Sequence, residues 1–466
     1  MNCFRLACWI FVLTFSLVAV PSALLRAQEN AELLELVVGL LNDDDKEMRA
    51  VGLEQVRTEL KGEAATQQLL ALLPKLKPEA QTALIGALGD RGDISARPAL
   101  VEIVTDKSRD VAVQAAAVRA IGALGSEADL PMLVGLLSSS VPELKAAARA
   151  SLVQLRGRET LQAMSAAMTS AAPPIRITLM EILVERRAAE AIPNLLTAAV
   201  EGDSAVRIAA MKALGQIGTP EQLSGMVAGV LKAEAGKERE AAEKAVMFVC
   251  QRIEKVDDRP IPLLAAIEKQ TPADQLSLLS TLGRVGGAGA LTMIEGKIAS
   301  ANAREHEIGI RALCNWPDAT IADRLLELIK SEKRPELGAV LLSALIRVAP
   351  LPDRRTPEDR LALLQTAMKL CTKDSERNLV LKRAPAIRSV ETLRWVLTFF
   401  DKPELAVQAH EAVVELAHHR NLREPNKVEF TAALDKVLAA SKNEIVRERA
   451  QRYKNGQTWD RKSVGE

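Results

Sequence analysis

The chain has 466 residues, with 61 lysines and arginines against 60 aspartates and glutamates. This balance argues against a nucleic-acid-binding protein, because such proteins carry a clear excess of basic residues. Only 3% of the residues are aromatic, which favours helices stacked through small side chains. A chain of this length splits into globular domains unless it is an array of repeats.

The first residues have the composition of an export signal. Arg5 precedes an apolar run from about Ala7 to Val20, which is shorter than the ~20 residues that span a bilayer. Pro21 and small residues follow, as they do before a cleavage site. We therefore expect residues 1–27 to be a secretory signal peptide of a bacterial protein. The mature chain is then periplasmic or secreted, without a membrane span. An uncleaved membrane anchor is the alternative.

Export limits how the cysteines are interpreted. Cys3 and Cys8 lie in the leader, so only Cys250, Cys314 and Cys371 remain in the mature chain. Three widely spaced cysteines do not make a disulfide framework. We expect them to be small buried apolar side chains, and one disulfide between neighbouring repeats is the alternative.

The segment 203–218, DSAVRIAAMKALGQIG, has the pattern of one amphipathic helix. At about 100° per residue its apolar side chains fall on a single stripe. Asp203 or Ser204 can cap the amino end, and Asp203 stands four residues before Arg207, a favourable spacing for an ion pair. Lys212 lies on the solvent face, and Gly215 and Gly218 predict the helix end. One such helix cannot bury its stripe alone.

Copies of this helix recur at a step of about 32 residues. One series of polar side chains follows an apolar or small residue in each copy: Arg49, Gln81, Gln114, Lys145, Arg176 and Arg207. A second series is apolar: Val56, Leu88, Ile121, Leu152, Ile182, Leu214, Phe248, Leu282, Leu313 and Leu345. Shorter apolar segments lie between these helices, and several open on a proline, which the first turn of a helix tolerates. The unit is thus helix–turn–helix, and the fold class is all-α.

The repeat resembles the HEAT-repeat family, especially the short bacterial HEAT-like type related to chromophore-lyase repeats. The resemblance rests on DSAVRIAAMKALGQIG, RDVAVQAAAVRAIGALG and PEAQTALIGALGDRG and covers nearly the whole mature chain. It implies a right-handed α-solenoid of about 12–13 repeats. It also implies a ladder in which a turn Asp and a helix Arg join neighbouring repeats. The residues that match the ladder are Asp203, Arg49, Arg176 and Arg207. Gln or Lys replaces the Arg in several copies, so we expect a broken ladder.

The carboxy end departs from the pattern. A proline-rich insertion, PLPDRRTPEDR at 350–360, interrupts the period. We expect the repeat array over 28–349, further aromatic-rich repeats over 350–440, and a basic cap or tail over 441–466. Trp395 and Phe399 share a helix face at i,i+4. They are either part of the core of a terminal cap or a recognition patch, since aromatic residues are common in binding hot spots.

Combinations of residues that could carry out chemistry are sparse. His410 and His418 are too far apart along a helix to share a metal ion. Glu415 and His419 could lie on one face, but no second pair completes the three or four ligands that zinc needs. TLGRVGGAGA at 281–290 follows a helix, whereas a phosphate-binding loop follows a strand. The sequence therefore predicts no catalytic, cofactor or metal site.

Binding to other proteins is the function that remains. The solvent face of the second helix of each repeat lines the concave side of solenoids of this kind. Its candidate residues are Arg119, Lys212, Gln216, Arg284, Arg311 and Arg347. All but Gln216 are cationic, which predicts a broken basic stripe for an acidic protein surface, although exposed helices also carry such charges for solubility. We predict an exported, non-enzymatic scaffold for protein–protein interaction. An accessory enzyme of the chromophore-lyase kind is the alternative.

The leader gives the first testable prediction. Because the apolar run is too short to span a bilayer, mass spectrometry of the exported protein should find a new amino terminus between Leu24 and Glu29. An intact Met1 terminus in the membrane fraction would instead identify a retained anchor.

Overall fold

A computed structural model describes residues 33–457. The described part consists of helices joined by short turns and 3-10 segments, with no strand. The protein is an all-α solenoid, as the sequence predicts. The expected leader at 1–27 and the end of the expected cap at 458–466 lie outside the described residues.

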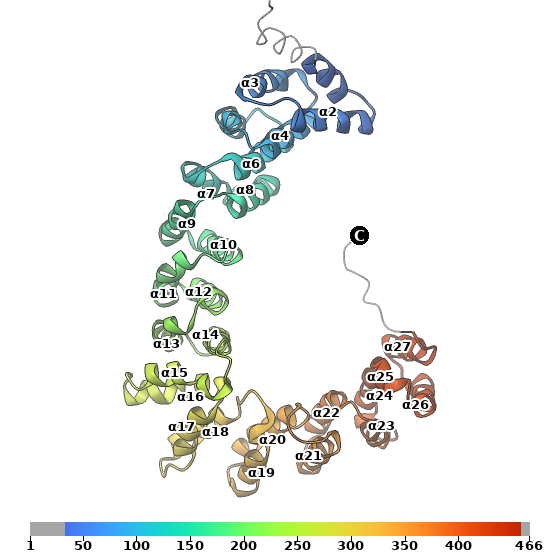
Figure 1. Cartoon of the computed structure of the whole chain (residues 1–466). Helices are drawn as coiled ribbons and strands as arrows, with labels where there is room; N and C mark the ends of the chain where they lie inside the picture. Colours follow the sequence, from blue (N-terminus) through green and yellow to red (C-terminus); the bar gives the residue numbers. More distant parts are fainter. Residues whose placement is uncertain (1–32, 458–466) are drawn as a thin grey trace, which may run out of the picture. The chain divides into compact units, whose positions relative to one another are not determined.

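The chain divides into two compact units, up to Asn194 and from Leu195 onward. In the first unit the first and second helices of the repeats form two layers (Figure 1). The first helices are the helical residues 33–41, α3 (Glu63–Leu72), α5 (Arg97–Thr105), α7 (Leu130–Leu136) and α9 (Arg158–Ser170). The second helices, each in contact with the next, are α2 (Lys46–Thr58), α4 (Pro78–Arg91), α6 (Val111–Leu124), α8 (Pro142–Gln154) and α10 (Pro173–Glu185).

The second unit has the same two layers. The first helices are α11 (Ile192–Glu201), in which the division between the units falls, α13 (Leu223–Lys232), α15 (Ile261–Ile267), α17 (Ala288–Ile298), α19 (Ala322–Ser331), α21 (Pro357–Leu370) and α23 (Val390–Leu397). The second helices are α12 (Ser204–Ile217), α14 (Lys237–Cys250), α16 (Pro272–Val285), α18 (Ala303–Leu313), α20 (Pro335–Val348), α22 (Asp374–Arg383) and α24 (Pro403–His418). The short α25 (Arg420–Arg423) and the pair α26 (Lys427–Ala440) and α27 (Glu444–Lys454) follow.

These helices make thirteen pairs over the described residues, within the predicted number of repeats. The Pro-rich insertion at 350–360 forms the turn between α20 and α21 and the first residues of α21, and it adds no separate helix. Single 3-10 turns stand beside several helices: η1 (Leu73–Lys75), η2 (Ile94–Ala96), η3 (Glu127–Asp129), η4 (Ala189–Ala191), η5 (Pro220–Gln222), η6 (Val256–Asp258), η7 (Ala319–Ile321) and η8 (Ala384–Ala386).

Many helices begin where the sequence supplies an acceptor or a proline. The carboxylates of Asp45, Asp110 and Asp203 accept hydrogen bonds from the first backbone N–H groups of α2, α6 and α12, which lack partners within the helix. Pro98 and Pro131 stand in the first turn of α5 and α7, where a missing N–H costs nothing. Local chemistry therefore sets these helix starts.

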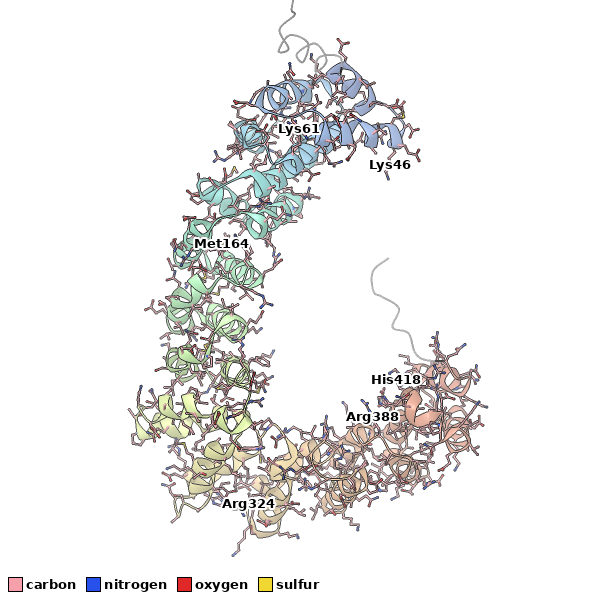
Figure 2. The ribbon with its side chains drawn as sticks, viewed as in Figure 1. Lys46, Lys61, Met164, Arg324, Arg388 and His418 are labelled. Carbon is pink, nitrogen blue, oxygen red and sulfur yellow. The ribbon has the colours of Figure 1, made fainter. Side chains whose placement is uncertain are left out.

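The periodic apolar residues form the core between the layers. Every member of the second series is fully buried except Phe248, which is 50% exposed. Its neighbour Val249 is fully buried on α14, so the repeat step places the core position one residue later than the sequence pattern suggests. Met164 on α9, labelled in Figure 2, is also fully buried.

Glycine lets neighbouring second helices approach closely. A Cβ atom on Gly122 of α6 would lie 2.7 Å from the Cα atom of Ser151 on α8. Gly215, which the sequence suggests as a helix end, instead lies inside α12, where a Cβ atom would lie 3.0 Å from the Cα atom of Ala245 on α14. Gly218 is the residue that ends α12. The backbone–backbone packing of these helices depends on the absence of a side chain.

The three cysteines of the described residues form no disulfide. Cys250 and Cys371 are buried and Cys314 is partly exposed, and all three are free. Phe399 is 7% exposed, and Phe430 and Tyr453 are fully buried. These aromatic residues therefore belong to the core of the C-terminal repeats.

Two glycine substitutions separate close packing from helix propensity. Gly122→Ala should destabilise the protein by about 1–3 kcal/mol, because the new methyl group overlaps Ser151. Gly86→Ala is the matched control, since Gly86 lies within α4 with open space around it, and it should stabilise by about 0.5–1 kcal/mol. Thermal unfolding of both variants tests this. Equal shifts of the two midpoints would contradict it.

Candidate functional site

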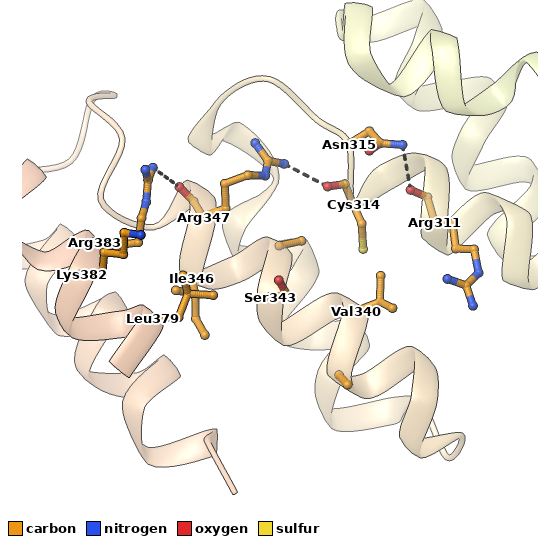
Figure 3. A pocket seen from close by; sticks show the side chains of 12 residues that line it. Arg311, Cys314, Asn315, Val340, Ser343, Ile346, Arg347, Leu379, Lys382 and Arg383 are labelled. Carbon is orange, nitrogen blue, oxygen red and sulfur yellow. Dashed lines mark hydrogen bonds between the residues drawn. The ribbon is translucent and has the colours of Figure 1, made fainter. Parts of the chain in front are cut away.

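An open groove lies on the second-helix face of α18, α20 and α22, within the second unit (Figure 3). Its volume is about 820 Å³. The residues that line it are Arg311, Cys314, Asn315, Ala339, Val340, Ser343, Ala344, Ile346, Arg347, Leu379, Lys382 and Arg383. Four of them are cationic, and none is a carboxylate.

Helical spacing brings polar and apolar groups together in the groove. Val340, Ser343 and Arg347 lie three and four residues apart on α20, so they share one face. Leu379 on α22 contributes an apolar side chain that is 37% exposed. The groove thus has an apolar surface beside a row of positive charges.

Two of the arginines are fixed by backbone carbonyl groups. Arg347 Nη2 donates to the carbonyl oxygens of Cys314 at 2.9 Å and Trp316 at 2.7 Å, just beyond the end of α18. Arg383 Nη2 donates in turn to the carbonyl oxygen of Arg347 at 3.0 Å. Figure 3 shows both guanidinium groups on the same side of the groove. Carbonyl groups at a helix end lack intrahelical partners, and these arginines supply the missing donors. Because each donor lies in the repeat after its acceptor, the contacts also join successive repeats.

The positive charge of these groups is not neutralised. Within the described part of the chain, no ion pair joins Arg347, Lys382 or Arg383 to a carboxylate. Burial lowers the pKa of Arg347, and the positive charges of Arg383 and Arg284 lower it further. Only Arg311 has a carboxylate partner, with its Nε 2.8 Å from Glu307 Oε1 on the exposed surface. The groove therefore carries an unbalanced positive charge in a partly buried position.

The groove holds one cysteine, Cys314. Burial raises the pKa of its thiol to about 12, although Arg347 and Arg311 act in the opposite direction. The thiol is therefore protonated near neutral pH, whereas reactive cysteines are thiolates. No histidine or carboxylate among the lining residues stands ready to take its proton.

Comparison with known proteins places the repeats in a family. Residues 66–153 and 160–247 match HEAT repeats. The chain carries HEAT repeats. No curated protein matches the sequence.

Solved structures that resemble the chain include large solenoid proteins. A mutant of Kap121p is 12% identical with a TM-score of 0.47, over 93% of this chain and 54% of that one. A chain of the AP-3 complex is 14% identical with a TM-score of 0.39, over 93% and 87%. Kap95p, from a structure with RanGDP, is 12% identical with a TM-score of 0.42, over 94% and 65%. The chain thus spans about half the length of Kap121p.

The predicted ladder residue Arg207 lies within the residues that match HEAT repeats and contacts the next repeat. Its Nε donates to Glu238 Oε1 at 2.7 Å, its Nη2 to Glu238 Oε2 at 3.1 Å, and its Nη1 to the carbonyl oxygen of Gly202 at 2.8 Å. The spacing of Asp203 and Arg207 suggests an ion pair within one helix. The structure instead pairs Arg207 with the next repeat, because Asp203 faces the backbone N–H of Val206 as the cap of α12.

The other ladder candidates have different surroundings. Arg49 donates to the carbonyl oxygens of Asp43 and Asp44, both at 2.8 Å, in the turn before its own helix. The Nε of Arg176 is buried without a hydrogen-bond partner in the described part of the chain. In the same series Gln114 donates to the carbonyl oxygen of Asp106 at 2.9 Å. At this position of the repeat, the neutral Gln114 thus donates to a backbone carbonyl oxygen before its own helix, as Arg49 does.

The six residues predicted for the basic stripe have different surroundings. Arg311 and Arg347 line the groove. Arg119, Lys212 and Gln216 are exposed on other second helices.

Arg284 and Arg347 differ from the prediction that both face solvent. The side chain of Arg284 is 22% exposed, and its Nε lies 2.8 Å from Glu243 Oε2 on the preceding second helix, α14. Arg347 is partly buried against the end of α18. Both side chains bend over a neighbouring repeat, which the projection of a single helix does not represent.

The aromatic pair does not form an exposed patch. The rings of Trp395 and Phe399 meet edge to face with centroids 5.3 Å apart. Phe399 is buried, as the core alternative of the sequence analysis expects. Trp395 is partly exposed. The terminal core uses Phe399 because the end repeats must cover an apolar face.

Several important residues were missed from the sequence. Glu238 stands 31 residues after Arg207, so one further repeat step from Arg207 would have reached it. Lys382 and Arg383 follow the Pro-rich insertion, where the period of the sequence is lost. In the first unit, Arg97 and Asp129 form a bidentate pair at 2.7 and 2.8 Å across 32 residues, and neither side chain belongs to the series identified from the sequence.

The described residues hold neither a metal-binding cluster nor a membrane-spanning helix. Among residues 33–457, no three or more His, Cys, Asp or Glu side chains are grouped to hold a metal ion. In the same part of the chain, every helix is too short or too polar to cross a bilayer.

The pair of Arg207 and Glu238 gives a stability prediction. Arg207→Ala should cost about 2–3 kcal/mol at neutral pH, because it leaves the buried Glu238 carboxylate without its partner. Chemical denaturation measures this loss. Arg119→Ala, on an exposed side chain of α6, is the control and should change stability by less than about 0.5 kcal/mol.

The same variant should show a defined pH dependence. The hydrogen bond from Arg207 lowers the pKa of Glu238, against the effect of burial. This stabilisation is present above the unfolded carboxyl pKa of about 4.3 and is lost as the pH falls through the folded value. The difference between wild type and Arg207→Ala should therefore shrink below about pH 4. A difference that stays constant from pH 7 to pH 3.5 would contradict this role.

Proposed function

We propose that the protein is an exported, non-enzymatic scaffold whose groove on α18, α20 and α22 binds an acidic segment of a partner protein. The observation that carries this proposal is the unbalanced charge of Arg347, Lys382 and Arg383. The leader at the start of the sequence supports export, and the balanced overall charge argues against a general affinity for polyanions.

The charge of the groove favours carboxylate ligands. Arg347 and Arg383 repel each other in a partly buried position, and a bound carboxylate would relieve this repulsion. Guanidinium groups fixed by backbone carbonyls are already oriented, so less side-chain entropy is lost when a ligand binds. Val340 and Leu379 offer an apolar surface beside the charges, which suits a segment with both acidic and apolar side chains.

The dimensions of the groove favour a peptide segment over a small anion. Packed helices lie about 8–10 Å apart, so three successive second helices extend over roughly 20 Å. An extended chain covers about 3.3 Å per residue. A segment of about six residues therefore matches the groove, and a single small anion would leave most of it unfilled.

The chemistry of the groove supports binding over catalysis. The protonated thiol of Cys314 is a poor nucleophile. The hydroxyl of Ser343 has no histidine or carboxylate beside it among the lining residues, and a serine nucleophile needs such a base.

Charge reversal tests the proposal. The probe is a fluorescein-labelled dodecapeptide in which Glu alternates with Leu, and its anisotropy reports binding. Arg311→Glu with Lys382→Glu should weaken binding roughly tenfold, since each exposed charge contributes about 0–1 kcal/mol and reversal replaces attraction by repulsion. Both residues are exposed and neither caps a carbonyl group, so the fold should persist by circular dichroism.

The control variant is Arg119→Glu with Lys212→Glu. It changes the net charge equally at exposed positions outside the groove and should bind the peptide as the wild type does. Added salt should slow association with the wild type. Equal weakening by both double variants, or displacement of the peptide by short single-stranded DNA at matched charge, would reject a dedicated groove for acidic protein segments.

A further inference from the structure

A second, smaller pocket lies in the C-terminal repeats, apart from the residues of the groove. It has a volume of about 400 Å³ and is lined by Arg388, His418, His419, Arg420, Asn421 and Leu422. The residues come from the loop before α23, the end of α24 and α25. Figure 2 labels Arg388 and His418, which lie on the same side of these repeats. Five of the six side chains can donate hydrogen bonds, and none is a carboxylate.

The two arginines of the pocket are available to a ligand. Arg388 and Arg420 are exposed, and within the described residues neither side chain forms a hydrogen bond or an ion pair. This distinguishes them from Arg423 on α25, whose buried side chain donates to the carbonyl oxygen of Ala417 at 2.9 Å and to Glu424. Arg423 therefore stabilises the backbone around the pocket, whereas the side chains of Arg388 and Arg420 are exposed to solvent.

A buried network orients His418. Its Nδ1 lies 2.9 Å from the hydroxyl of Tyr453, a fully buried side chain of α27. Burial lowers the pKa of Arg449, but hydrogen bonds to Glu415 and Tyr453 outweigh this effect and raise it. Because Arg449 only donates, the Tyr453 oxygen accepts from it and the Tyr453 hydroxyl is free to donate to His418 Nδ1. With Nδ1 accepting from Tyr453, His418 presents Nε2–H on the ring edge away from Tyr453.

The charges around His419 show that the pocket is electropositive. Burial lowers the pKa of His419, and the positive charges of Arg388 and His418 lower it further, while Glu415 raises it. The Glu415 carboxylate is itself paired with Arg449 at 2.6 Å. The rings of His418 and His419 have centroids 5.5 Å apart. A bound anion would attract each of these positive groups and so offset the repulsion between them.

We propose that this pocket binds a phosphate group, as inorganic phosphate or a small phosphomonoester. Arg388 and Arg420 neutralise its two charges, and His418 Nε2–H, His419 and the Asn421 amide donate to its oxygens. A carboxylate has two oxygens and one charge, so it would use only part of this set of donors. Phosphate presents more acceptor oxygens and up to two charges near neutral pH. The site is separate from the groove proposed for acidic segments and does not depend on that function.

Calorimetry with the mature chain tests the site directly. Inorganic phosphate is titrated at constant ionic strength in chloride, which controls for screening. Arg388→Gln with Arg420→Gln should weaken phosphate binding at least tenfold, since each variant removes a charge-assisted pair of hydrogen bonds. Arg354→Gln is the matched control, because Arg354 is an exposed arginine of the loop before α21 and lies outside the pocket. It should bind phosphate as the wild type does.

Imidazole resonances give a second measurement that needs no substitution. Phosphate should shift the signals of His418 and His419 and raise the pKa of His419, because an adjacent anion favours imidazolium. His306, bound to Ile298 and Glu332 on other helices, and the buried His410 are internal controls whose signals should stay in place.

Three results would overturn the proposal. The first is that phosphate in large excess leaves all four histidine signals unchanged. The second is that acetate at equal concentration produces the same shifts with the same affinity. The third is that the chain binds vesicles that carry phosphate headgroups without binding inorganic phosphate, which would point to a membrane surface.

Discussion

The carbonyl groups at the ends of the helices set a constraint on the whole structure. A helix leaves its last four carbonyl groups without an intrahelical partner, and an array of short helices repeats this problem in every turn. Side chains of the second helices solve it within a repeat, as when Gln114 donates to the Asp106 carbonyl. Arginines also solve it between repeats. Arg252, in the turn after α14, donates to the carbonyl oxygens of Gly215 and Gln216, and Arg347 on α20 donates to those of Cys314 and Trp316.

This solution has an electrostatic consequence, because an arginine that caps a carbonyl brings a full positive charge to a neutral partner. On α12 and α14 a carboxylate balances the charge of such an arginine: Glu238 accepts from Arg207, which also donates to the Gly202 carbonyl, and Glu243 accepts from Arg239, which also donates to the Val230 carbonyl. Among residues 33–457, no carboxylate forms an ion pair with Arg347 on α20 or Arg383 on α22. The unbalanced positive charge that favours ligand binding in the groove therefore results from the way these repeats are joined. Substitution of Arg347 would disturb both roles at once.

Much of the fold could be predicted from the sequence because the repeat period is a direct record of packing. The apolar series identified the core, with Phe248 as the exception, since a shift of one residue along α14 moves a side chain from the core to the solvent. Gly215 shows a second limit. Glycine ends helices and also permits close packing, and only the neighbouring Ala245 decides between these roles.

The candidate groove could be predicted only in part. Projection of single helices placed Arg311 on the solvent face correctly, but it also placed Arg284 and Arg347 there. Long side chains reach beyond their own helix, so their surroundings depend on the adjacent repeat. Lys382 and Arg383 could not be assigned to a repeat position, because the insertion at 350–360 removes the period that defines such positions. Sequence periodicity therefore identifies which residues face outward more reliably than what they contact.

The groove and the phosphate pocket use positive charge in different ways. The guanidinium groups of Arg347 and Arg383 are held by carbonyl oxygens, so their charge and direction are constant over the physiological pH range. In the pocket, burial and the neighbouring positive charges lower the pKa of His419, and the hydroxyl of Tyr453 fixes the direction of the His418 ring. A ligand of the groove therefore meets a fixed surface, whereas an anion in the pocket changes the protonation of the groups that bind it. Fixed arginines suit a long segment that must align with three helices, and titratable donors suit a small ion whose own charge changes over the same pH range.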